Sequence, residues 1–296
     1  MKLAFSTLGV PGLPVADVVR LAAAHGYHGV ELRAHPEEPV HAGLDSARRA
    51  DVVAEFKAAG VEILGLAGYV RVAAPGDDDA VLGELRELLG LARDLGAPFV
   101  RVFPGGGPGQ ESETPETPET PENATNAENA AKFGDSDSSG ASEGSDALAA
   151  RRLGRAAEWA ADLGVRILLE THDSHPTAAD ALRVVGPVGH RNVGVLWDVL
   201  HTWRGGEQPS ETFASLGPYL GYVQVKDVAS AQDSTPVALG AGVLPLGECV
   251  EVLSRGGWDG WVCWEYEKRW YESAAPLPGL LTAGRDHLAR LLNDSA

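Results

Sequence analysis

The chain has 296 residues, of which 44% are hydrophobic, so it is long enough to bury a sizeable core. Its 42 acidic residues exceed its 24 basic residues, and this net charge of −18 without a basic cluster excludes nucleic acid as an expected partner, because phosphates would repel it. The N-terminal stretch does not read as a signal peptide and no run approaches a membrane span, so we expect a cytoplasmic protein without a membrane partner.

Short apolar runs alternate with amphipathic stretches along the chain. The runs that we interpret as strands are 3–7, 29–33, 62–68, 99–105, 166–171, 193–199, 221–227 and 261–267. Stretches such as 14–26, 80–96 and 280–292 space apolar residues three and four apart, which is typical of helices. Eight strands that alternate with helices predict an α/β fold, a single (β/α)8 TIM barrel with parallel strands. A doubly wound open sheet is the alternative, but no glycine-rich nucleotide fingerprint follows the first strand.

Residues 105–146 interrupt this alternation. They contain ten acidic residues, one Lys, a single aromatic residue (Phe133) and a threefold "TPE" repeat. Such a composition cannot bury enough apolar surface to offset the entropy of ordering, so we expect a disordered acidic loop inserted after strand 4. Without it the chain keeps a length typical of one barrel, and residues 1–296 are therefore expected to form one domain. We interpret the loop as a tolerated insertion, with a functional lid as the alternative.

The last four apolar runs all end on ionisable or amide side chains, in "ILLETHD" (167–173), "GVLWDVLH" (194–201), "GYVQVKD" (221–227) and "WVCWEYE" (261–267). The carboxyl ends of barrel strands carry the chemistry of barrel enzymes, because the loops converge there. Side chains two residues apart on a strand share a face, so Glu170 points into the barrel if Leu168 does. The same alternation applies to Asp198 with Leu196.

A metal site follows from this convergence. Gln224 and Glu265 lie at the same depth as Glu170 and Asp198, which brings together three carboxylates and one amide. Three carboxylates in a site of low dielectric repel one another unless a cation lies among them. Oxygen ligands of this kind favour one divalent ion such as Mn²⁺ or Mg²⁺.

These motifs resemble a known family. "GYHGVELR" (26–33), "LLETHD" (168–173), "LWDVLH" (196–201), "YVQVKD" (222–227) and "WEYEKRW" (264–270) are similar to those of the xylose isomerase-like TIM barrels. The resemblance is to the sugar phosphate isomerase and epimerase members, of the D-tagatose 3-epimerase type, which bind one divalent metal through Glu, Asp, His and a second Glu. It implies that Glu170, Asp198 and Glu265 are metal ligands. Gln224 stands where those epimerases carry His, so Mn²⁺ or Mg²⁺ is favoured, with Co²⁺ or Zn²⁺ as alternatives.

The resemblance also implies a reaction. Family members act on a sugar or sugar-like polyol ketone, removing a proton next to the carbonyl and passing through an enediolate. Glu170 and Glu265 would be the catalytic acid and base. An inosose-type dehydratase on the same metal site is an alternative, and so is a non-catalytic sugar-binding barrel that lost its activity with its His. A homodimer or homotetramer is left open.

A further set of side chains near the strand ends is expected to contact the sugar substrate: His201, Lys226, His172, Arg101, Glu267 and Trp270. Each has an alternative role. Arg101 is the right type of residue to hold an anionic group, but an ion pair with Glu31 is the favoured use. Glu267 has Arg269 or Lys268 as alternative partners. Lys226 is equally suited to a salt bridge in the barrel mouth, and Trp270 to packing against loops.

Overall fold

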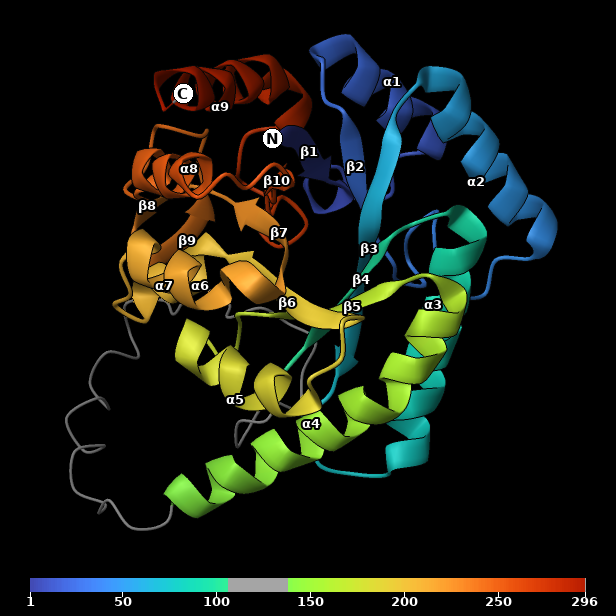
Figure 1. Ribbon diagram of the computed structural model, residues 1–296. Coiled ribbons are helices and arrows are strands. Elements are labelled where there is room, and N and C mark those ends of the chain that lie inside the picture. Colours follow the sequence, from blue (N-terminus) through green and yellow to red (C-terminus); the bar gives the residue numbers. More distant parts are fainter. Residues whose placement is uncertain (106–137, 296) are drawn as a thin grey trace.

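The computed structural model describes residues 1–105 and 138–295, and it confirms the predicted (β/α)8 barrel. Eight parallel strands close in the order β1-β10-β7-β6-β5-β4-β3-β2, with helices around the outside (Figure 1). The barrel strands are β1 (Lys2–Ser6), β2 (Gly29–Arg33), β3 (Glu62–Arg71), β4 (Phe99–Phe103), β5 (Arg166–Glu170), β6 (Val193–Asp198), β7 (Leu220–Val225) and β10 (Trp261–Trp264). An antiparallel pair, β8 (Val228–Ser230) and β9 (Asp233–Pro236), follows β7.

The α-helices of the described residues are α1 (Val15–His25), α2 (Ser46–Ala59), α3 (Asp78–Leu95), α4 (Ser138–Leu163), α5 (Ala178–Val188), α6 (Val199–Arg204), α7 (Pro209–Leu216), α8 (Leu246–Arg255) and α9 (Leu281–Asp294). Their ends follow local chemistry. Asp45 caps α2 by accepting from the Arg48 amide at 2.8 Å, and Gly60 ends that helix with a φ of 65°. None of these helices is long and apolar enough to cross a membrane.

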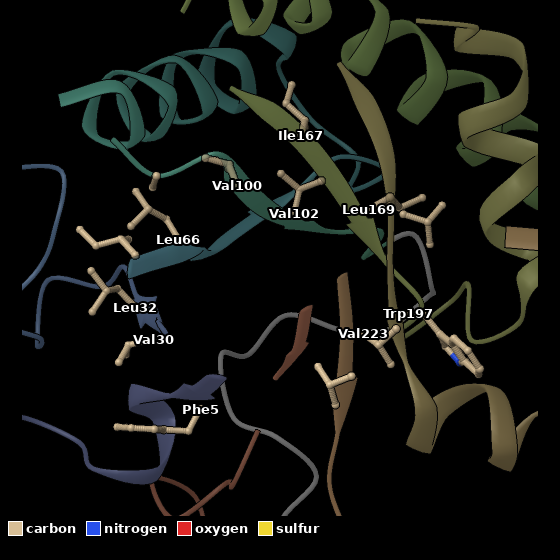
Figure 2. Close-up of a cluster of buried hydrophobic side chains, with 14 of the residues drawn as sticks. Phe5, Val30, Leu32, Leu66, Val100, Val102, Ile167, Leu169, Trp197 and Val223 are labelled. Atoms are coloured by element: carbon tan, nitrogen blue, oxygen red, sulfur yellow. The ribbon is translucent and has the colours of Figure 1, made fainter. Parts of the chain in front are cut away.

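The core forms two layers on opposite faces of the strands. The outer layer fills the space between strands and helices and includes Phe5, Val102 and Leu169 (Figure 2). The inner layer lies within the barrel and consists of Ala4, Leu64, Leu168, Leu196, Tyr222 and Cys263. Leu168 and Leu196 therefore do face inward, and the residues two positions further along their strands lie at the carboxyl end of the barrel.

Some element boundaries differ from the sequence prediction. β3 continues to Arg71, which lies opposite Phe103 of β4. β10 ends at Trp264, so Glu265 and Glu267 lie in the loop after the strand and not within it. The amide of Glu265 nevertheless donates to the Val225 carbonyl at 2.9 Å, which holds Glu265 beside β7.

The predicted loop at 105–146 was wrong at its carboxyl end. Residues 106–137 lie outside the described residues, but the backbone from Ser138 is already helical in α4. The reason is a tertiary contact that composition does not reveal. Asp146 is buried, with Oδ1 2.8 Å from His175 Nε2, and its Oδ2 accepts from Arg183 Nε at 2.7 Å. These contacts join the first turns of α4 to the β5–α5 loop and to α5.

Candidate metal and active site

Three carboxylates, from β5, from β6 and from the loop after β10, converge at the mouth of the barrel. Glu170 ends β5, Asp198 ends β6 and Glu265 follows β10, and all three are buried. One carboxylate oxygen from each lies within 4.8 Å of the others. Asp198 also caps α6, because its Oδ1 accepts from the Leu200 amide at 2.8 Å. The helix start thus fixes the side chain that projects toward the other two carboxylates.

Two buried cations lie against these carboxylates. Arg101 of β4 donates from a terminal guanidinium nitrogen to Glu170 at 2.9 Å and lies 3.7 Å from Glu265. Its Nε donates to the Gly68 carbonyl at 3.1 Å. Lys226 Nζ contacts Glu265, donates to Glu267 at 2.6 Å and lies 2.8 Å from Asp198 Oδ2. Both cations are therefore held by several partners at once.

Gln224 occupies the fourth predicted ligand position and is fully buried. Its Nε2 donates to both oxygens of Glu31, at 3.1 and 2.9 Å, and lies 3.1 Å from Glu265 Oε1. Tyr222 donates its hydroxyl to the same Glu31. The amide oxygen of Gln224 is buried and has no hydrogen-bond partner in the described part of the chain. An unpaired buried acceptor costs free energy, which a bound cation would recover.

Burial shifts the protonation of this cluster. It raises the pKa of Glu170 to about 8, although the charge of Arg101 acts in the opposite direction. Burial also raises the pKa of Glu31, and repulsion from Glu265 adds to the shift. Burial alone would lower the pKa of Lys226, but the three carboxylates around it raise the pKa well above its usual value. The ammonium group of Lys226 is therefore positively charged at neutral pH.

The charges of the cluster fit a divalent cation. Its acidic groups outnumber its basic groups: Glu31, Glu170, Asp198, Glu265 and Glu267 against Arg101 and Lys226. Buried negative charge in excess must be protonated or balanced by a cation. The oxygen ligands available, three carboxylates and the free amide oxygen of Gln224, are those that hard divalent ions prefer. The residues present thus fit the ion that the sequence predicts.

Two histidines lie at the outer side of this cluster. The rings of His172, after β5, and His201, in α6, are 4.1 Å apart between centroids, and the ring of Phe103 is 4.6 Å from that of His172. His201 Nε2 is 4.0 Å from Asp198 Oδ2. Burial, together with the charges of His172 and Lys226, holds the pKa of His201 well below its usual value. The His201 imidazole is therefore neutral near pH 7.

Trp270 is the predicted residue that the structure does not bring into the cluster. Its ring lies against two guanidinium groups, with centroid distances of 5.5 Å to Arg33 and 5.7 Å to Arg269. Arg33 in turn donates to Tyr69 and Glu38, each at 2.8 Å. Within the described residues, no hydrogen bond or ion pair joins Trp270 to the carboxylates.

One predicted pairing was wrong, and the alternative partners named for Glu267 are not used. Arg101 pairs with Glu170 and not with Glu31, because Glu31 is engaged by Gln224 and Tyr222. Glu267 pairs with Lys226, so neither alternative partner is used. Arg269 contacts Glu37 instead, and Lys268 donates to backbone carbonyls of its own loop.

Sequence reasoning did not find the role of Glu31 and Tyr222. Both face into the barrel, and Glu31 was visible as a carboxylate at the end of a strand. Their contact joins β2 to β7, which are separated around the barrel by β1 and β10. Such a pairing across the barrel interior depends on closure of the sheet, so no local sequence signal indicates it.

Comparisons with known proteins agree with this fold. A family profile described as "Xylose isomerase-like TIM barrel" matches residues 19–291. A putative hydroxypyruvate isomerase of Streptomyces coelicolor is 28% identical to this chain over 272 residues, which cover 86% of each protein. A 3-dehydroshikimate dehydratase of Bacillus anthracis is 22% identical over 218 residues, which cover 73% of this chain and 67% of that protein.

Solved structures show the same fold. D-psicose 3-epimerase from Clostridium cellulolyticum H10, with D-tagatose, superposes with a TM-score of 0.76 at 17% identity, covering 99% of both chains. The IolI protein, solved with a zinc atom, gives a TM-score of 0.75 at 17% identity, covering 100% of this chain and 99% of that one. The profile match spans most of the chain, and the chain therefore belongs to the xylose isomerase-like TIM barrel family.

Proposed function

We propose that the protein is a divalent-metal-dependent isomerase or epimerase of a sugar or sugar-like polyol ketone, acting by proton abstraction next to a carbonyl through an enediolate. The observation that carries the proposal is the convergence of Glu170, Asp198 and Glu265 within 4.8 Å. The amide nitrogen of Gln224 lies 3.1 Å from Glu265, and its amide oxygen has no hydrogen-bond partner among the described residues. The similarity to a putative hydroxypyruvate isomerase and the shared fold with 3-epimerases support the same class of reaction.

Glu170, Asp198, Gln224 and Glu265 would hold the metal. When bound, the ion would draw electron density from the carbonyl and hydroxyl oxygens of the substrate and make the neighbouring carbon acid stronger. Mn²⁺ or Mg²⁺ is favoured because no imidazole belongs to this ligand set.

Glu170 and Glu265 are proposed as the acid and base. They come from β5 and from the loop after β10, so they approach a substrate from different strands. Arg101 contacts one oxygen of Glu170, while both oxygens of Glu265 have donors, Gln224 on Oε1 and Lys226 on Oε2. Glu170 is therefore the carboxylate with an oxygen more open to a substrate proton, and it takes that proton at this oxygen.

The substrate would be held by side chains around the same mouth. His172 and His201 are partly exposed and lie beside Glu170 and Asp198. Lys226 and Arg101 would polarise or neutralise substrate oxygens, and Glu267 would orient Lys226. Trp270 would form a more distant wall on which an apolar face of the sugar packs.

The first test measures metal content and turnover together. We expect about one Mn²⁺ or Mg²⁺ per chain by elemental mass spectrometry, and loss of it in the E170Q/E265Q double variant. Each single variant should then lose nearly all turnover in a screen of ketoses. A protein that takes up no metal after incubation with Mn²⁺ would contradict the proposal. The non-catalytic sugar-binding barrel would then be the favoured function.

A dehydratase on the same site is the second candidate, favoured by the similarity to a 3-dehydroshikimate dehydratase and by the contact between Lys226 and Glu265. In that reaction a carboxylate takes the proton next to the carbonyl, Lys226 gives a proton to the departing hydroxyl group, and water leaves as a carbon–carbon double bond forms. The product is a conjugated carbonyl compound with a strong ultraviolet absorbance that the substrate lacks. An epimerisation produces no such absorbance, so one spectrum separates the two.

A further inference from the structure

A second group of potential metal ligands lies next to the first. One oxygen of Glu170 and one ring nitrogen from each of His172 and His201 lie within 4.8 Å of one another. Glu170 comes from β5, His172 from the turn after it and His201 from α6. The two imidazole side chains are 29% and 19% exposed, so this group lies nearer the barrel mouth than the buried carboxylates.

The His172 ring is held in place from its outer side. The residues from His172 to His175 form a tight turn, closed by backbone hydrogen bonds of 3.1 and 2.8 Å between these two residues. Within this turn Asp173 has a φ of 47°, the one positive φ of a non-glycine residue in the described chain. This conformation brings Asp173 Oδ1 within 2.6 Å of His172 Nδ1. A carboxylate on one ring nitrogen is the usual support of a histidine whose other nitrogen binds metal.

The His201 ring is tied to the first ligand group. It belongs to the first turn of α6, the helix that Asp198 caps, and its Nε2 is 4.0 Å from Asp198 Oδ2. The backbone that positions a carboxylate ligand of the first group therefore also positions His201. Glu170 belongs to both groups, and a carboxylate has two oxygens and four lone pairs, enough to contact a cation on each side.

We propose that Glu170, His172 and His201 form a second cation position, which binds a borderline divalent ion such as Zn²⁺ or Co²⁺. Two imidazoles and one carboxylate suit these ions, whereas carboxylate and amide oxygens suit Mn²⁺ and Mg²⁺. The two positions thus differ in ligand chemistry. The first has the amide of Gln224 and no imidazole, whereas the second has the imidazoles of His172 and His201. This site goes beyond the proposed function, which uses one cation and assigns the two histidines to the substrate. With an ion in the second position, His172, His201 and an oxygen of Glu170 would contact that ion and not the substrate.

Metal stoichiometry tests the second position. Metal-free full-length protein is dialysed against Zn²⁺ or against Mn²⁺, and bound metal is measured by elemental mass spectrometry and by isothermal titration calorimetry. We expect about two Zn²⁺ but about one Mn²⁺ per chain. In H172N and in H201N, bound Zn²⁺ should fall to about one. The control is H25N, at the end of α1 in the outer helical layer, which should keep the wild-type stoichiometry.

Other outcomes have distinct meanings. One Zn²⁺ per chain in the wild type, or a second Zn²⁺ that survives both histidine substitutions, would overturn the second position. Because His172 and His201 are partly exposed, their variants are expected to fold, and far-ultraviolet circular dichroism verifies this. E265Q removes a ligand of the first group alone. In one outcome, neither the wild type nor E265Q binds Mn²⁺ or converts a substrate, yet both bind a Zn²⁺ that is lost in H201N. The proposed function then fails and the second position stands.

Discussion

The amide nitrogen of Gln224 lies between the two carboxylate oxygens of Glu31, 3.1 Å from Oε1 and 2.9 Å from Oε2. Because an amide nitrogen only donates and an amide oxygen only accepts, this contact fixes which end of the side chain faces Glu31. Tyr222 donates to the same carboxylate and holds it in place. In the proposed metal site, Glu31 would therefore act indirectly, by keeping the Gln224 oxygen free for a cation.

The first prediction concerns Glu31. In E31Q the neighbour of Gln224 can donate as well as accept, so the amide can turn and place its nitrogen toward the cation. We expect Mn²⁺ affinity to fall about 10- to 100-fold, as is usual for residues that orient a metal ligand. Titration calorimetry with Mn²⁺ measures this. E62Q, at an exposed glutamate paired with Lys2, should leave the affinity unchanged. Equal affinities in both variants would remove this role from Glu31.

The second prediction concerns Gln224 itself. In Q224H an imidazole replaces the amide, and Glu31 can accept from one ring nitrogen while the other faces the site. We expect Zn²⁺ and Co²⁺ to bind more tightly relative to Mn²⁺ than in the wild type, because imidazole favours these ions. Competition titrations between Mn²⁺ and Zn²⁺ give the ratio. The comparison is best made in the H201N background, where the proposed outer position is removed.

The third prediction concerns pH. Burial raises the pKa of the Glu170 carboxyl from its ordinary value of 4.5 to about 8 in the folded protein. Between these values the unfolded state binds fewer protons than the folded state, so the free energy of unfolding of the metal-free protein falls as pH rises through this window. A divalent cation holds the ionised carboxylate, so its stabilising effect should grow over the same window. Urea unfolding at about pH 5 and about pH 8, with and without Mn²⁺, measures both effects.

The matched variant for this test is E170Q, which removes the titrating group. Its metal-free stability should change less between the two pH values than that of the wild type. A wild-type profile that matches the E170Q profile would mean that Glu170 ionises normally in the folded protein.

The fourth prediction concerns His175. Its side chain is 2% exposed and joins the β5–α5 turn to Asp146 of α4. In H175A the Oδ1 of Asp146 loses its partner inside the protein, which should lower the free energy of unfolding by about 1–3 kcal/mol. The turn that carries His172 should also loosen. H190A, at a histidine whose side chain is 27% exposed, is the control and should cost less. Urea unfolding of the wild type and both variants measures the two losses of stability, and equal losses in H175A and H190A would contradict the prediction.

The fold was predictable because two regular patterns repeat along the chain. The alternation of strands and helices predicted the barrel, and the period of two along β5 and β6 predicted that Glu170 and Asp198 follow Leu168 and Leu196 on the inner face. The start of α4 was not predictable, because residues near Asp146 have a composition typical of solvated loops and become helical in contact with His175 and Arg183. Tertiary contacts overrode local preference there.

The convergence of the three carboxylates was predictable, but their pairings were not. The strand ends identified the carboxylates, since each follows directly from the sequence of one strand. Which cation contacts which carboxylate depends on distances across the closed barrel. Arg101 of β4 faces Glu170 on the adjacent strand β5, whereas Glu31 lies nearer to β7 residues on the far side of β1 and β10. The sequence of one strand at a time holds no information on such distances.

The amide of Gln224 has one more consequence, for the behaviour of the site in acid. A histidine ligand competes with protons, because its nitrogen must be unprotonated to bind a metal, and its usual pKa is about 6.5. An amide oxygen has no such competitor. If Gln224 is a metal ligand as proposed, Glu31 would hold its amide oxygen in place when the surroundings become mildly acidic. Protons would then lower metal affinity only by protonating Glu170, Asp198 and Glu265.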